Sequence, residues 1–201
     1  MNSAQQGGNT LIVSLILMLV FTIIGMTSVS NVSFNKKMST NQRDSDLAFQ
    51  AAEAALAEGE DYVAGISASL VDSDFGVGCS SNLCFTSNCA DGRCFNGSYG
   101  VGLLCSINAP ATPVYKEETV WETGGAARES RINFPGLLRP PQYLVEFLCF
   151  VQADPTAPSP TPPPPYAAAD WAYYYRVTSY AEGANGTSRV MLQSTFKVNR
   201  L

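Results

Sequence analysis

Residues 11–29 read LIVSLILMLVFTIIGMTSV, and residues 47–60 read LAFQAAEAALAEGE. The first stretch holds twelve Leu, Ile, Val or Phe residues, and no charged side chain occurs between Met1 and Asn35. About 20 apolar residues match the hydrocarbon core of a bilayer, which is roughly 30 Å thick. A cleaved secretory signal is the alternative, but its apolar region is normally about 7–15 residues long. We therefore expect residues 10–30 to form a membrane-spanning helix.

The second stretch is expected to continue this helix beyond the membrane. Ala, Glu and Leu are strong helix formers, and no proline occurs before Pro110. Apolar residues recur every three or four positions, which places them on one face of the helix. The face predicted to pack against a head domain consists of Phe49, Ala52, Leu56, Gly59, Val63, Ile66 and Leu70. We predict one helix over residues 9–70, on the order of 90 Å long at 1.5 Å per residue.

Composition argues against several classes of function. The chain has 201 residues, a formal net charge of −5 and only 12 Lys plus Arg residues, so it lacks the basic surface that nucleic acids require. It contains no His, which is the commonest general base and the commonest zinc ligand. Charged residues cluster in the middle of the chain (Glu117, Glu118, Glu122, Arg128, Glu129 and Arg131), and we interpret them as solvated surface. We expect one head domain, no nucleic-acid partner, no cofactor and no enzymatic activity, with a signal-anchored periplasmic enzyme as the alternative.

Three segments near the C-terminus have the composition of β-strands. Residues 143–151, 173–181 and 190–198 are rich in Tyr, Val, Phe and Leu. Asn185-Gly186 suits a turn with positive φ, so the last two segments are expected to form an antiparallel hairpin. The predicted fold class is α+β: a long, partly transmembrane N-terminal helix packed on a small antiparallel sheet. A proline-rich surface loop, residues 154–166, is expected between the first two strands.

Six cysteines follow the helix: Cys79, Cys84, Cys89, Cys94, Cys105 and Cys149. The first four recur every five residues within a loop rich in Gly, Ser and Asn, residues 79–105. Four thiolates can hold zinc, but zinc sites usually pair their cysteines as C-x2-C. Cysteine-rich heads are typical of oxidising compartments, so we expect disulfides, with their pairing left open. An extracytoplasmic head conflicts with the positive-inside rule, because Lys36, Lys37 and Arg43 follow the apolar segment, and we give the cysteines more weight.

Several stretches resemble one known family. Gln6-Gly7-Gly8, followed at once by an apolar helix, resembles the leader of a prepilin. Residues 41–56, NQRDSDLAFQAAEAAL, resemble the helix of PilX-type minor pilins of type IV pili, and residues 175–196 are similar to the closing strands of that family. The resemblance covers the first 65 and the last 35 residues, while residues 71–142 match no pattern.

The resemblance implies a maturation step and a set of partners. A prepilin peptidase would remove the leader, residues 1–8, between Gly8 and Asn9, with the Gly7–Gly8 bond as the alternative. The mature chain would consist of the helix, residues 9–70, and a head, residues 71–201. Implied partners are the major and other minor pilins, the peptidase and the inner-membrane assembly platform, with a tip adhesin as a further candidate. The chain would lie in the inner membrane, with its head in the periplasm, before assembly, and in the pilus at the cell surface afterwards.

One position departs from the family pattern. Most pilins carry Glu at the fifth mature position, where this chain has Val13. In pilins this Glu is thought to neutralise the N-terminal amine of the subunit above, which Val13 cannot do. The departure favours the topmost place in a filament, although a neutral residue without positional meaning is the alternative. The resemblance thus implies a minor pilin that helps initiate pilus assembly at or near the tip and supports adhesion and twitching motility. A receptor-binding pilus module and a type II secretion-like pseudopilin are the alternative functions.

Overall fold

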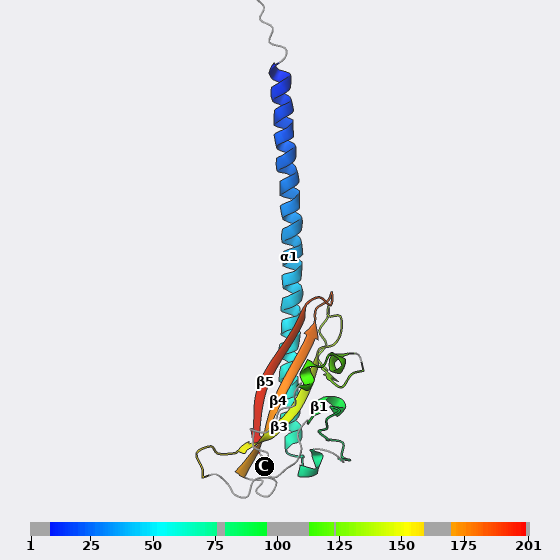
Figure 1. Ribbon diagram of the computed structural model, residues 1–201, viewed down its shortest axis with the longest axis vertical. Coiled ribbons are helices and arrows are strands. Elements are labelled where there is room, and N and C mark those ends of the chain that lie inside the picture. The colour runs from blue at the N-terminus through cyan, green and yellow to red at the C-terminus, as the bar shows by residue number, and fades with distance from the viewer. Residues whose placement is uncertain (1–8, 76–78, 96–112, 123, 159–169, 200–201) are drawn as a thin grey trace, which may run out of the picture. The chain divides into compact units, whose positions relative to one another are not determined.

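The computed structural model describes residues 9–75, 79–95, 113–122, 124–158 and 170–199, without the side chains of residues 9, 27–31 and 72 (Figure 1). The chain divides into two compact units, Met1–Arg43 and Asp44–Leu201. Helix α1, Asn9–Ser67, contributes its first part to one unit and its second part to the other. The second unit contains the sheet and both disulfide-bonded loops, and we call it the head.

Helix α1 ends three residues earlier than predicted. The amides of Ser69 and Leu70 donate to the carbonyls of Ile66 and Ser67, which lie only three residues back. Such hydrogen bonds tighten the final turn of a helix and satisfy carbonyls that its end would otherwise leave unpaired. Leu70 is nevertheless buried, so it reaches the core from just beyond the helix.

The sheet contains the three predicted strands and two short additional ones. Its elements are β1 (Arg93–Cys94), β2 (Arg128–Glu129), β3 (Gln142–Gln152), β4 (Trp171–Glu182) and β5 (Arg189–Asn199). Strands β3, β4 and β5 are antiparallel neighbours, and β2 also pairs antiparallel with β3. The three predicted strands are therefore antiparallel as expected, and β1, which pairs with β3 in parallel, makes the sheet mixed. Strand β1 belongs to the disulfide-bonded loop after the helix, and this loop reaches β3 running in the same direction as β3. The parallel pairing spans two residues.

The turn between β4 and β5 is fixed by a carboxylate of α1. Gly186 has a φ of 67°, as expected for the Asn185-Gly186 turn. The amide of Ala184 donates to Asp44 Oδ1 at 2.6 Å. A Cβ atom on Gly183 would lie 2.3 Å from Asp44 Oδ2, so only glycine allows this close approach.

The core lies between α1 and one face of the sheet. Small residues of α1 approach most closely, and a Cβ atom on Gly59 would lie 2.6 Å from Val177 Cγ1. The fully or almost fully buried residues of α1 are Ala48, Ala51, Ala52, Ala55, Gly59 and Val63. Beyond the end of α1, rings of the loop and the sheet gather: Phe75, Phe85, Phe95, Phe147, Phe150, Tyr173 and Tyr175. The register of β3 shifts between Phe147 and Cys149, which lets Phe147 and Phe150 both enter this cluster, with ring centroids 5.1 Å apart.

The helix face that we predicted is only partly the buried one. Ala52, Val63 and Leu70 are buried, whereas Leu56 and Ile66 are half-buried and pack against the core. Phe49 is 43% exposed. The buried face consists mainly of alanines, including Ala48 and Ala51 on either side of Phe49 in the sequence. Alanine fits there because the strands approach the helix too closely for a large ring.

The other face of the sheet is covered by a layer that the sequence did not predict. Two short 3-10 helices, Val114–Lys116 and Glu118–Trp121, pack on Leu144 of β3. The Trp121 indole donates to the carbonyl of Tyr115 at 2.9 Å. This layer joins the Cys89–Cys94 disulfide to the sheet through a second apolar cluster.

The proline-rich loop begins as expected after β3. Gln152 Nε2 donates to the carbonyls of Ala157 and Pro158, and the Asp154 carboxylate accepts from the amide and hydroxyl of Thr156. These hydrogen bonds from Thr156 hold the pKa of Asp154 below its usual value. Residues 159–166 of the predicted loop lie outside the described residues.

Candidate functional site

The first unit presents apolar side chains around the whole circumference of α1. From Leu11 to Met26 the described side chains are all exposed, and Met18 and Phe21 are 75% and 68% exposed. A helix that is apolar on every side is normally covered by lipid or by other protein chains. The side chains of residues 27–31 are not described. Among the described residues, no helix combines the length and the apolarity needed to cross a bilayer.

The predicted maturation site lies at the start of this helix. α1 begins at Asn9, and Gly8 lies outside the described residues. Val13 is 52% exposed on the first turns of the helix, among other apolar side chains. A carboxylate at this place would therefore be available to a second chain, and Val13 supplies none.

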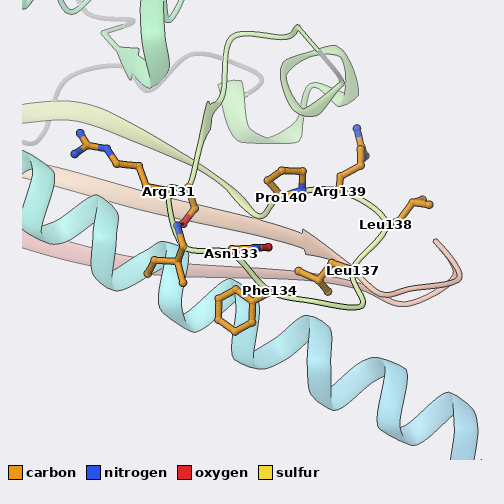
Figure 2. A pocket seen from close by; sticks show the side chains of 9 residues that line it. Arg131, Asn133, Phe134, Leu137, Leu138, Arg139 and Pro140 are labelled. Atoms are coloured by element: carbon orange, nitrogen blue, oxygen red, sulfur yellow. The ribbon is translucent and has the colours of Figure 1, made fainter.

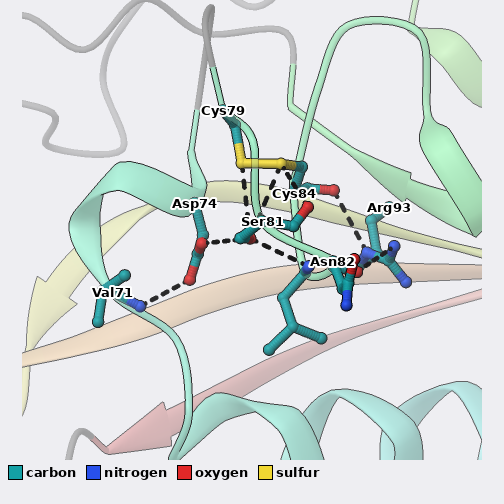
Figure 3. Close-up of a disulfide and its surroundings, with 8 residues drawn as sticks. Val71, Asp74, Cys79, Ser81, Asn82, Cys84 and Arg93 are labelled. Carbon is teal, nitrogen blue, oxygen red and sulfur yellow. Dashed lines mark hydrogen bonds between the residues drawn. A yellow bond between two sulfur atoms is a disulfide. The ribbon is translucent and has the colours of Figure 1, made fainter.

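The first disulfide closes a small loop on a buried carboxylate. Cys79 and Cys84 are bonded, with their Cα atoms 5.7 Å apart. The Asp74 carboxylate is 2% exposed and accepts hydrogen bonds from the Val71 amide and the Ser81 hydroxyl, as Figure 3 shows. Asp74 therefore connects the segment after α1 to the disulfide loop.

The second disulfide joins Cys89 and Cys94, and its loop is held by charge. Asp91 lies within this loop and pairs with Arg93 at 2.9 Å and with Arg128 of β2 at 2.7 Å. The Arg128 guanidinium lies 4.3 Å from the centre of the Tyr62 ring of α1, and Arg93 donates to the Tyr62 hydroxyl. Two arginines thus fasten the loop to both the helix and the sheet.

The disulfides that we expected are confirmed where the structure describes them. Two disulfides join Cys79 to Cys84 and Cys89 to Cys94. These bonds use all four thiols and so exclude the four-thiolate zinc site considered above. Cys149 of β3 is also disulfide-bonded. Cys105 lies outside the described residues.

A cavity of about 340 Å³ lies within the loop between β2 and β3. Its lining, seen in Figure 2, is formed by Ser130, Arg131, Ile132, Asn133, Phe134, Leu137, Leu138, Arg139 and Pro140. The Glu58 carboxylate of α1 accepts from the Ser130 hydroxyl and the Arg131 amide at the mouth of the loop. Arg139 is already paired with Glu182 at 2.8 Å, so its charge is largely neutralised within the head.

Ion pairs lie beside the second apolar cluster on the outer face of the sheet. Arg176 of β4 forms two hydrogen bonds with Glu146 of β3, at 2.8 and 3.0 Å, beneath the Tyr115 ring. Burial would lower the pKa of Arg176, but its bonds to Glu146 outweigh this and raise it. This paired geometry holds β3 and β4 in register.

Glu182 occupies a similar position at the end of β4. It accepts from Arg139 and from the Tyr180 hydroxyl, and it lies 3.4 Å from Arg189 of β5. Burial acts to raise the pKa of Glu182, but the bonds from Tyr180 and Arg139 lower it below its ordinary value. Burial raises the pKa of Tyr180 to about 12, with the Glu182 hydrogen bond adding to the effect.

The charged residues between 117 and 131 do not form a common site. Arg128 pairs with Asp91, Arg131 lies 3.9 Å from Glu58, and Glu118 lies 3.5 Å from Arg189. Each therefore serves a different contact within the head. Glu146 and Arg176 each lie between two apolar residues in the sequence, which indicates that both side chains point to the outer face of the sheet. We did not use this signal to predict the ion pair between them.

Two family models match this chain. "PilX N-terminal" matches residues 7–57, and "Type IV pilus assembly protein PilX C-term" matches residues 79–198, which is more than half of the chain. The second match covers residues 79–142 of the middle segment for which we found no sequence pattern. No curated protein and no solved structure gives a significant match. With its long helix on a sheet and its disulfide-bonded loops, the chain belongs to the PilX family and is a minor pilin of type IV pili.

Proposed function

We propose that this minor pilin helps to initiate pilus assembly and occupies a place at or near the pilus tip. The observation that carries the proposal is Val13, an exposed, uncharged residue at the fifth position after the expected cleavage site. The PilX family consists of structural pilins rather than enzymes, which is consistent with an assembly role.

The charge balance in the filament core supports this position. A charged group within a bilayer costs roughly 2.5–3.5 kcal/mol and is usually paired. A subunit with Glu at the fifth position can neutralise the N-terminal amine of the subunit above it. This chain can offer the Asn9 amine to a subunit arriving below, but Val13 cannot neutralise an amine overhead. The topmost place is the one that requires no such carboxylate.

Maturation and membrane insertion come before this step. We propose that prepilin peptidase cuts between Gly8 and Asn9, and that the apolar residues 11–29 hold the chain in the inner membrane with its head in the periplasm. The two disulfides support an oxidising location for the head. Assembly would then transfer the helix from lipid into the filament, where it meets the major and other minor pilins and the assembly platform.

Adhesion and twitching motility are proposed consequences of the tip position. A tip subunit carries its head into contact with surfaces, and the cysteine-rich and proline-rich loops are the candidate contact regions of this head. A receptor-binding module is the second candidate function, and it is supported by the length of these loops. A tip adhesin seated on the head would serve the same purpose.

The tip position is tested by locating the chain in sheared pili. Immunogold labelling should find it at one end of the filament, and sequencing of the copurified chain should begin at Asn9. The variant Val13→Glu should still enter the membrane but should reduce incorporation at the tip, whereas Val20→Leu, also within the apolar segment, should behave as the native chain does. Labelling along the whole shaft would refute the tip position, and a mature chain that keeps Met1 would refute the maturation step.

Deletion separates the candidate functions. Loss of pili indicates a role in assembly, and retained pili with lost attachment indicate adhesion. A chain that supports secretion of another protein but leaves pili unchanged would instead be a pseudopilin.

A further inference from the structure

The two edges of the sheet differ in their protection. At the β3 edge, β1 and β2 pair with the strand, and a bulge interrupts it after Phe147. At the β5 edge, pairing with β4 runs from Ala172↔Asn199 to Glu182↔Arg189 without a register shift, and no described strand covers the other side of β5. Figure 1 shows β5 at this edge. Strand β5 contains no Pro, no Gly, no bulge and no inward-facing charge, and the outward-facing Arg189 and Lys197 are the features it has that oppose pairing at an edge.

Apolar side chains beside this edge are incompletely covered. The side chains of β5 that face α1 are only half-buried, whereas their partners in β4, such as Tyr175 and Val177, are fully buried. On α1, Leu56 is half-buried and Phe49 is 43% exposed, one turn before Ala52, which packs with Val190 and Leu192. We call this set the β5 strip: Phe49, Leu56, Val190, Leu192, Phe196 and Val198. A further strand paired with β5 would cover it.

The outward row of β5 indicates the charge of such a strand. This row consists of Arg189, Met191, Gln193, Thr195, Lys197 and Asn199, all exposed. It carries two cations and no carboxylate. Arg189 is already paired with Glu182 and Glu118, whereas Lys197, among the described residues, donates only to the carbonyl of Ala153, so an acidic side chain directly opposite Lys197 would be favoured. A second copy of β5 fits less well, because it would bring two more cations to the same row.

We propose that β5 accepts an extended segment of a partner protein as an additional strand. In that segment, apolar residues alternate with acidic or polar ones: the apolar side chains cover the β5 strip, and an acidic side chain lies beside Lys197. Main-chain hydrogen bonds along the edge supply affinity, and the alternating side chains supply selectivity. The proposal concerns the head alone and does not depend on where in the filament this subunit lies.

Photocrosslinking of the full-length protein in its own cells tests the proposal. A photoreactive amino acid replaces exposed Thr195 of β5 in one strain and exposed Glu117 in another, and mass spectrometry identifies the crosslinked peptides. We expect Thr195 to crosslink to a segment of a different protein in which apolar residues occupy alternate positions. Glu117 should not yield this segment.

Matched variants then show whether the β5 strip is required. Phe49→Asp should lower the Thr195 crosslink about tenfold, because a buried charge loses its hydration. Ile132→Asp is the control, since Ile132 is 42% exposed but belongs to the loop between β2 and β3. Should Phe49→Asp fail to accumulate, Met191→Asp, at a position 41% exposed, serves instead, because its charge repels an acidic strand. Any of four results would overturn the proposal. The first two are an equal loss of the crosslink in the Phe49 and Ile132 variants and a crosslink to a second copy of β5. The other two are a crosslinked segment without alternating apolar residues and a crosslink yield at Thr195 no higher than at Glu117.

Discussion

The face of the sheet that meets α1 and the face that meets residues 113–127 are held by different forces. On the helix side, Val177 and Tyr143 lie against Gly59, the ring of Phe147 packs among other aromatic rings, and apolar contact predominates. On the outer side, Glu146 and Arg176 form a paired ion bridge under the Tyr115 ring. One sheet thus combines a face stabilised by burial with a face that adds directional pairing to a smaller apolar cluster, and the two should respond differently to substitution.

The largest effect is expected on the helix side. Phe147→Ala should lower the free energy of unfolding by about 3–5 kcal/mol, because Phe147 is 3% exposed and contacts several other rings. Denaturant unfolding of the full chain in detergent measures this change. Thr195→Ala, at an exposed site on β5, is the control and should change stability by no more than about 0.5 kcal/mol. A loss below about 1 kcal/mol for Phe147→Ala would show that this face is not the main core.

The outer face should respond through charge. Glu146→Ala should cost about 2–3 kcal/mol, because it leaves Arg176 without its partner, although the Arg176 side chain is 23% exposed and can recover part of its hydration. A double-mutant cycle with Arg176→Ala measures the coupling between the two residues. If the cycle yields no coupling energy, the ion pair does not stabilise this face and the contrast between the faces fails.

Two glycines of α1 sharpen the account of the helix side. Gly59→Ala should destabilise the head by about 1–2 kcal/mol, because the new Cβ would lie 2.6 Å from Val177 Cγ1. Gly65→Ala is the matched control, since nothing lies within 4 Å of its Cβ position, and it should stabilise the chain by about 0.5–1 kcal/mol. Unfolding of both variants under the same conditions gives the comparison. Stabilisation by Gly59→Ala, as expected for Gly65→Ala, would mean that the close approach at Gly59 is not required.

Alkaline pH should act on both faces by a smaller amount. Burial raises the pKa of Tyr143, on the helix side, and of Tyr180, on the outer side, to about 12 from an ordinary value of 10.0. Because the folded-state pKa is the higher one, each group's contribution is complete below pH 10 and is lost as the pH rises towards 12. At pH 11 the loss should be about 1 kcal/mol per tyrosine.

The variant Tyr143→Phe separates the two tyrosines. Among the described residues the buried Tyr143 hydroxyl has no hydrogen-bond partner, so its removal should change stability at neutral pH by about 0.5 kcal/mol or less. The variant should also lose its share of the alkaline destabilisation, which unfolding at several pH values would record. A large loss at neutral pH would instead reveal a partner for this hydroxyl.

The apolar face was largely predictable from sequence, and the outer face was not. Strand-forming composition and the Asn185-Gly186 turn located β3, β4 and β5 to within about two residues, because aromatic and β-branched side chains fit a half-buried pleated surface. The helix pattern identified Ala52, Val63 and Leu70, but it favoured the large Phe49 over the alanines that the close approach of the sheet demands. The strands β1 and β2 depend on contacts between distant segments, for which local sequence gives no signal. Alternation could place Glu146 and Arg176 on the outer face, but only the register of β3 and β4 shows that they pair.

The proposed assembly site was accessible to sequence for another reason. Val13 was found by its place relative to an expected cleavage site, and this depends on counting residues rather than on folding. The open edge of β5, by contrast, is visible only once the neighbours of each strand are known.

The position of Asp44 has a practical consequence for engineering. It is the first residue of α1, among those described, whose side chain is buried, and it holds the β4–β5 turn through the Ala184 amide. The head therefore includes its own segment of helix. A truncation that starts a few residues before Asp44 should retain every helix residue of the core and yield a head suited to purification without detergent. One that starts at Glu53 would discard Ala48, Ala51 and Ala52 together with the carboxylate that fixes the hairpin. Fusions that exchange heads between pilins should be joined at the same point.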